Sequence, residues 1–184
     1  MMADRSETTE RMLDVLGAAG PHPDHASQLM LYGQFVGAWE GRVVVTRRDG
    51  TSREESCEVF FGWVLEGRAI QDVWIGPARA DRADPARDAR LDTYGTTIRV
   101  YDPERGLWEI TWIDPNSQSY GRMTGKLQGD DIVQEYRDDD STLWQWRFTD
   151  ITSDSFRWIA RESADEGATW QIRNEFFLKR RRGD

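Results

Sequence analysis

The sequence is poor in the residues that build metal and redox sites. Its 184 residues include one cysteine, Cys57, and two histidines, His22 and His25. One cysteine excludes a disulfide within the chain, and because Cys57 lies in an apolar segment we expect a packed thiol. Both histidines lie in a proline-containing segment near the N-terminus. The sequence therefore predicts no metal site, no cofactor and no Ser-His-Asp catalytic site.

Long apolar runs and an excess of positive charge are also missing. No segment approaches the roughly 18 consecutive apolar residues of a membrane helix, and the N-terminal segment lacks the apolar stretch of a signal peptide. The formal net charge is −9 and the pI is near 4.8, which argues against a nucleic-acid or membrane partner. The expected location is the cytoplasm. The basic segment 179–182 is expected to be a solvated terminus.

Tryptophan is the residue that the sequence has in excess. It fills wide spaces or grips flat ligands, so nine of them in one chain indicate a sheet wrapped around a roomy interior. The nine are Trp39, Trp63, Trp74, Trp108, Trp112, Trp144, Trp146, Trp158 and Trp170.

From Trp39 onward, apolar and polar residues alternate with period two, which is typical of strands. The predicted strands span 39–47, 54–65, 68–75, 93–101, 107–113, 119–127, 131–137, 143–149, 155–163 and 169–179. Turn motifs such as Asp49-Gly50 and Asp114-Pro115-Asn116 separate most of them. Short strands joined by tight turns describe an antiparallel meander, and closure into a barrel removes its exposed edges.

The segment before the strands is predicted to be helical. One helix is expected over 4–16, with Asp4 as its cap and Glu7 at the capping-box position, and a second over 24–32. Residues 1–36 are thus expected to pack on a barrel formed by residues 37–180, with a basic tail at 181–184. The long connection 76–92 is predicted to be a mobile surface loop, or alternatively a lid over the barrel mouth.

Four segments carry a family resemblance. Gly37-Ala38-Trp39 opens the first predicted strand, and segments 67–74, 94–103 and 108–115 read GRAIQDVW, YGTTIRVYDP and WEITWIDP. With them the chain resembles the lipocalin-like (calycin) barrels, in particular a group of bacterial lipocalin-like domains of unknown function. The resemblance covers most of residues 33–178. It implies that Trp39 plugs one end of a barrel, and it lends no catalytic residues. We therefore expect an all-β fold, a closed antiparallel up-and-down barrel of about ten strands with short N-terminal helices.

Residues 163–170 read SADEGATW, which matches the Asp-box pattern Ser-x-Asp-x-Gly-x-Thr-Trp of sialidase propellers. Propellers carry one copy of this motif in several blades, whereas this chain has one copy. The motif is expected to be a structural hairpin, in which the aspartate and hydroxyl groups bond to the turn backbone.

Two carboxyl groups are expected to face inward among aromatic residues. Asp72 shares its predicted strand face with Ile70 and Trp74, and Glu162 shares its face with Trp158. A carboxyl group beside indole rings would act as an acid or base, or bind the polar end of a ligand, unless a neighbouring Arg or Trp N–H satisfies it. The face of Arg99 stays open, since a one-residue change of register reverses it.

The sequence thus favours a protein that binds a small, largely apolar molecule inside the barrel, and an aromatic or polycyclic molecule is the kind that we expect. The residues expected to contact the ligand are Trp74, Tyr94, Arg99, Trp112, Trp146 and Trp158. One alternative is an enzyme of the cyclase, isomerase or hydratase type that uses Asp72 or Glu162 as acid or base. Another is a structural or interaction protein with a filled barrel. The sequence leaves a homodimer open.

Overall fold

The computed structural model describes residues 7–82 and 92–181 and consists mainly of one sheet. The helices are α1 (Glu7–Leu16) and α2 (Ala26–Gly33), with 3-10 turns η1 (Pro23–His25) and η2 (Arg79–Asp81). The strands are β1 (Gly17–Ala18), β2 (Gly37–Thr46), β3 (Ser52–Val64), β4 (Ala69–Gly76), β5 (Thr93–Asp102), β6 (Leu107–Asp114), β7 (Ser119–Gln128), β8 (Asp131–Arg137), β9 (Leu143–Thr149), β10 (Ser155–Ser163) and β11 (Gln171–Arg180).

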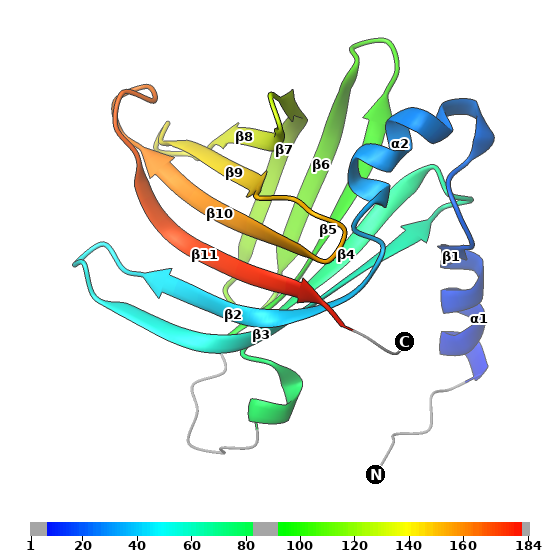
Figure 1. The fold of residues 1–184 in the computed structure, drawn as a ribbon, viewed down its shortest axis with the longest axis horizontal. Coiled ribbons are helices and arrows are strands. Elements are labelled where there is room, and N and C mark those ends of the chain that lie inside the picture. The colour runs from blue at the N-terminus through cyan, green and yellow to red at the C-terminus, as the bar shows by residue number, and fades with distance from the viewer. Residues whose placement is uncertain (1–6, 83–91, 182–184) are drawn as a thin grey trace.

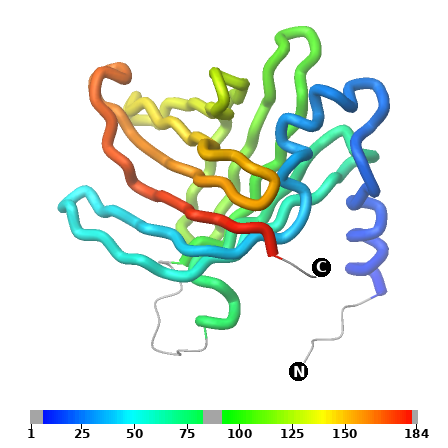
Figure 2. The backbone as a smooth tube through the Cα atoms, in the orientation of Figure 1, coloured from blue at the N-terminus to red at the C-terminus, as the bar shows by residue number. Residues whose placement is uncertain are grey.

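Strands β2 to β11 form a closed antiparallel up-and-down barrel, as predicted. Each strand pairs with the next along the chain, and β11 pairs back with β2, so that the barrel strands have no free edge along most of their length. Figure 1 shows the strands wrapped around the interior, and Figure 2 traces the same path through the backbone. The ten predicted barrel strands are all present, with ends shifted by at most two residues. The two-residue β1, which pairs with the end of β3, was missed because it has no alternation of its own.

Helix α2 and the segment after it fill one end of the barrel. Tyr32, Phe35 and Trp39 are almost fully buried there, and Phe35 lies 4.9 Å from the ring centre of Phe148. Trp39 donates its indole N–H to the Phe35 carbonyl at 2.7 Å, and the Arg180 guanidinium lies 4.2 Å from its ring. Trp39 therefore belongs to an aromatic plug that closes this end.

Two inward-facing glycines leave room for large aromatic side chains. A Cβ atom at Gly125 would lie 2.7 Å from the Tyr32 hydroxyl, and a Cβ atom at Gly95 would lie 2.3 Å from the Trp112 ring. Both distances are shorter than van der Waals contact allows. Gly125 thus admits the α2 plug, and Gly95 admits the Trp112 ring into the interior.

Helix α1 differs from α2 because none of its residues is buried. Met12, Leu13 and Val15 are exposed, and the helix bonds to the barrel at its last residue, where Leu65 N–H donates to the Leu16 carbonyl at 2.9 Å. The proposed cap Asp4 lies outside the described residues. Within the described ranges, no helix has the length and apolar character needed to cross a membrane.

The Asp-box motif forms the hairpin between β10 and β11. The Asp165 carboxylate accepts the Thr169 backbone N–H at 2.8 Å and the Thr169 hydroxyl at 2.6 Å, while the Ser163 hydroxyl accepts the Gly167 N–H at 2.8 Å. Trp170 packs under the Arg161 guanidinium at 4.2 Å. The hydrogen bonds of Ser163, Asp165 and Thr169 thus stay within their own hairpin, whereas Glu166 pairs with Arg137 of β8. Cys57 is buried in β3, and burial raises the pKa of its thiol to about 12.

Candidate functional site

A cavity of about 320 Å³ occupies the barrel interior at the end opposite α2. Its lining residues come from the strand ends far from the plug, such as Asp114 at the end of β6 and Ser119 at the start of β7. In Figure 1 the α2 end is on the right, and the β2–β3 and β10–β11 hairpins extend to the left. The barrel is therefore filled at one end and hollow at the other.

Aromatic side chains from six strands build the wall of this cavity. Trp158 lies in the middle, 5.0 Å from the ring centre of Trp74 and 5.2 Å from that of Trp146. Trp146 in turn meets the edge of Trp112 at 5.5 Å. All four were expected to contact a ligand, and the alternation of each strand brings them to the same surface.

Further residues line the cavity that the sequence reasoning did not single out as ligand contacts. The most prominent are Tyr136 and Trp144, whose rings are parallel within 11° with centres 6.2 Å apart. Trp144 is held by a hydrogen bond from its indole N–H to Asp138 at 2.9 Å, and burial raises the pKa of Tyr136 to about 12. Their signal was available, because Trp144 is two residues from Trp146 and so shares its face.

Arg99 faces inward, which resolves the register that the sequence left open. Its guanidinium donates to the Asp72 carboxylate, and neither side chain has any exposed surface. The second Asp72 oxygen accepts the Thr97 backbone N–H at 2.8 Å. Asp72 is therefore inward, as predicted, but both of its oxygens are engaged, and it lies behind Arg99 rather than on the cavity surface.

The guanidinium of Arg99 is also enclosed by aromatic rings. Its central carbon lies 4.9 Å from the ring centre of Tyr32, 5.9 Å from that of Phe61 and 5.7 Å from that of Phe148. These rings belong to the α2 plug and the strands around it. Arg99 thus separates the filled half of the barrel from the hollow half, and it lines the cavity on the side that faces the α2 plug.

Polar residues surround the mouth of the cavity. Asp92, Thr93, Asp114, Ser117, Ser119 and Asn174 line it, and the carboxylates of Asp92 and Asp114 are both buried. The mouth therefore places polar and carboxyl groups beside an aromatic wall.

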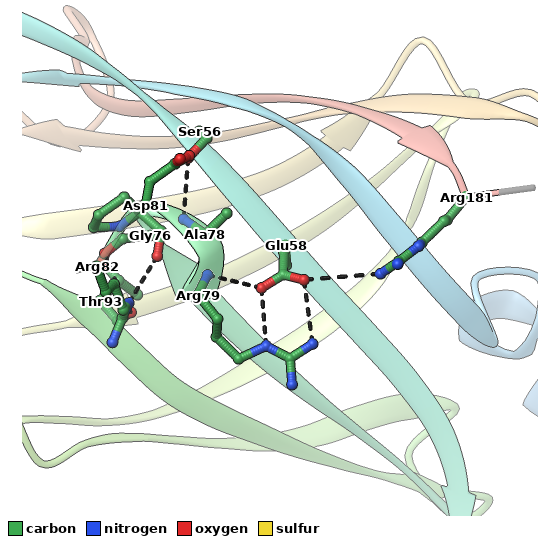
Figure 3. A network of polar contacts seen from close by, with 10 residues as sticks. Ser56, Glu58, Gly76, Ala78, Arg79, Asp81, Arg82, Thr93 and Arg181 are labelled. Carbon is green, nitrogen blue, oxygen red and sulfur yellow. Dashed lines mark hydrogen bonds and ion pairs between the residues drawn. The ribbon is translucent and has the colours of Figure 1, made fainter. Parts of the chain in front are cut away.

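A set of side-chain and backbone bonds holds the two described ends of the β4–β5 connection at this mouth (Figure 3). Arg82 donates to the carbonyls of Pro77 and Thr93, both at 2.8 Å, and lies 3.8 Å from the Asp92 carboxylate. On the outer face, the Glu58 carboxylate accepts the backbone N–H of Arg79 at 2.9 Å. The position of Asp92 and Thr93 at the mouth is thus fixed. Of the connection 76–92, which was expected to be a mobile surface loop or a lid, residues 83–91 lie outside the described residues.

Glu162 lies at the rim, beyond this cavity. It faces inward, but its oxygens pair with Arg173 at 2.6 Å and with Arg48 at 3.1 Å. These three residues help to line a second cavity of about 350 Å³, whose other lining residues are mostly polar. Glu162 is thus satisfied by arginines, which was the alternative stated for it.

Tyr94 is not part of the site, and this corrects its place among the expected ligand contacts. It lies on the outer face of β5, opposite Ile75, with 42% of its surface exposed, and the Arg82 guanidinium is 5.1 Å from its ring centre. Because Tyr94 and Arg99 are five positions apart on one strand, an odd step, they face opposite sides of the sheet.

Known structures share this architecture. An S-type phycobiliprotein lyase from Guillardia theta aligns with a TM-score of 0.58 and 12% identity over 84% of this chain and 93% of the lyase. Rv2717c from M. tuberculosis aligns with a TM-score of 0.57 and 20% identity over 88% of this chain and 99% of Rv2717c. No protein-family model and no curated protein sequence matches the chain. At these identities the likeness establishes the fold alone, and that fold is a lipocalin-like barrel.

Proposed function

We propose that the barrel interior binds a small, largely apolar ligand with a flat aromatic ring system. The observation that carries this proposal is the cavity of about 320 Å³ with five tryptophans in its wall. Small-molecule sites usually have volumes of about 300–1,000 Å³, apolar walls and a few placed polar groups. The wall supplies indole faces and edges for stacking, and the mouth supplies polar groups.

Catalysis on the same barrel has less support. One of the similar structures is named a lyase, so this architecture also occurs in an enzyme. In this chain, however, the oxygens of Asp72 and Glu162 are all engaged by arginine or backbone donors. A carboxylate held in this way has no oxygen free to exchange a proton with a substrate. Binding is therefore the function that the geometry favours.

The test is a fluorescence titration with N-phenyl-1-naphthylamine, a neutral probe that brightens in apolar surroundings. We expect saturable binding to the wild-type protein, and loss of binding by at least about tenfold in Ser119→Trp. Ser119 lines the mouth and is itself exposed, so the larger side chain obstructs the cavity without disturbing the core.

Thr111→Trp is the matched control, since Thr111 is exposed on the outer face of the neighbouring strand β6. It adds the same indole ring outside the barrel and should leave the affinity unchanged. A wild-type protein that shows no saturable binding, or a Ser119→Trp variant that binds as well as the control, would refute the proposed function.

A further inference from the structure

The cavity carries buried hydrogen-bond donors that lack acceptors. Across the described residues, the buried side-chain polar atoms without a partner include Nε and Nη2 of Arg99 and Nε1 of Trp158, and both residues line the cavity. All three atoms are N–H donors. Two other unpartnered atoms nearby, Thr97 Oγ1 and Gln134 Oε1, belong to residues that do not line it. The cavity thus has a one-sided need for an acceptor, because a buried N–H without a partner is costly.

The charges around these donors decide which kind of acceptor fits. The positive charge of Arg99 is already matched by Asp72, with both side chains fully buried. The other charged residues that line the cavity are Asp92 and Asp114, and both are carboxylates. Arg82, at the mouth, lies 3.8 Å from the Asp92 carboxylate. Among the described residues around the cavity, each arginine thus already faces a carboxylate, so a ligand carboxylate would be buried without a balancing charge, which is strongly unfavourable. A neutral carbonyl oxygen accepts the same N–H groups without that penalty.

Building on the proposed function, we propose that the ligand carries an uncharged carbonyl group, as in an aromatic ketone, aldehyde or quinone, at the end that enters the cavity first. Arg99 and Trp158 donate to this oxygen, and the tryptophan wall stacks on the ring system. Asp72 is a positioning residue: it holds the guanidinium and neutralises it, so that the site selects a neutral acceptor over an anion.

Three probes of one shape separate the possibilities. They are 2-acetylnaphthalene, which has a carbonyl; 2-isopropenylnaphthalene, in which a methylene group replaces the oxygen; and 2-naphthoate, which has a carboxylate. Each competes with N-phenyl-1-naphthylamine in a fluorescence displacement titration. On the wild-type protein we expect the ketone to bind about fivefold or more tightly than the alkene, because only the ketone accepts the buried N–H groups. We expect it to bind more tightly than the naphthoate as well.

Variants of Arg99 and Asp72 test whether this ion pair causes the preference for the ketone. Arg99→Met should reduce the advantage of the ketone over the alkene to less than about twofold. Asp72→Asn removes the negative charge that balances Arg99. The affinity of the naphthoate relative to that of the ketone should therefore rise by about tenfold or more. Tyr94→Phe, on the outer face of the same strand as Arg99, is the control and should leave all three affinities unchanged.

A readout on the wild-type protein keeps the test independent of how the variants fold. The infrared carbonyl stretch of bound 2-acetylnaphthalene should move to lower wavenumber than in hydrocarbon solvent, as expected for a hydrogen-bonded ketone. A hydrocarbon-like stretch would overturn the proposal, as would a ketone and an alkene of equal affinity; in that case ordered water satisfies the donors and the proposed function stands. If none of the three probes and no naphthylamine binds, both proposals fail.

Discussion

The Asp72–Arg99 ion pair is the residue-scale feature on which the interior depends most. Both side chains are fully buried, and the guanidinium lies between the aromatic plug and the cavity. Each partner makes the burial of the other tolerable, since a lone charge in this position would have no water and no counter-charge. The pair is thus expected to be strongly coupled in stability as well as in binding.

We predict that Arg99→Met and Asp72→Asn each lower the free energy of unfolding, by about 3–5 kcal/mol where a charge is left unpaired. The double variant should lose clearly less free energy of unfolding than the sum of the two single losses, because it also removes the charge that each single variant leaves unpaired. Urea denaturation of the four proteins measures this cycle. Single variants that each cost less than about 1 kcal/mol, or costs that simply add, would show that the pair does not couple.

At the same scale, sequence reasoning could find part of the site. Alternation placed Asp72 beside Trp74, and both do face inward. It did not identify Arg99 as the partner of Asp72, because the pairing of β4 with β5 crosses a long connection whose length sets no register. Tyr94 was misplaced for a local reason, since its separation from Arg99 already puts the two on opposite faces.

Among the elements, α2 and α1 differ in what they contribute. Phe35, just after α2, is 1% exposed and packs against Phe61, Phe148 and Phe156, whereas Val15 on α1 is 80% exposed. Composition did not reveal this difference, because both helices carry apolar residues. What separates them is the space beside Gly125 in the barrel, which the Tyr32 side chain of α2 enters.

We predict that Phe35→Ala lowers the free energy of unfolding by about 3–5 kcal/mol, the usual cost of removing a buried ring. Val15→Ala should change it by less than about 0.5 kcal/mol. Chemical denaturation of both variants against the wild type gives the comparison. Equal effects of the two substitutions would mean that α2 does not act as the plug.

The β10–β11 hairpin makes a prediction about pH. Bonds from the side chain and backbone of Thr169, and from Ser163, lower the pKa of Asp165 from 3.8 to about 2. Because the pKa is lower in the folded state, ionised Asp165 stabilises the fold above about pH 4, and this contribution disappears as the pH falls through 2. Asp165→Asn should therefore lower the melting temperature at pH 7, and the gap to wild type should narrow between pH 5 and pH 2.

Asp139→Asn, in another exposed turn, serves as the reference for this pH series. The difference in melting temperature between this variant and the wild type should stay small and constant over the same pH range. A gap for Asp165→Asn that remains constant or widens in acid would contradict the role given to the hairpin.

At the scale of the whole molecule, the barrel could be predicted from the sequence. Which half of its interior is packed with side chains could not. Period-two alternation and turn motifs located the ten strands, and the exposed edges of an open meander, together with the family resemblance, indicated closure. Which half is filled depends on contacts between distant segments, such as the hydrogen bond of 2.9 Å from Gln134 to the Tyr32 hydroxyl. The nine tryptophans accordingly divide between two settings that look alike in sequence: five line the cavity, and four lie elsewhere.

This division offers the most direct test of the proposal that the barrel interior is a binding site. Each tryptophan gives one indole N–H signal in a ¹H–¹⁵N correlation spectrum, and tryptophan-to-phenylalanine variants assign them. On titration with 2-acetylnaphthalene, the signals of Trp74, Trp112, Trp144, Trp146 and Trp158 should shift, because these rings line the cavity. Those of Trp39, Trp63, Trp108 and Trp170 should stay in place. Shifts confined to the second group, or no shifts in either group, would contradict ligand binding inside the barrel.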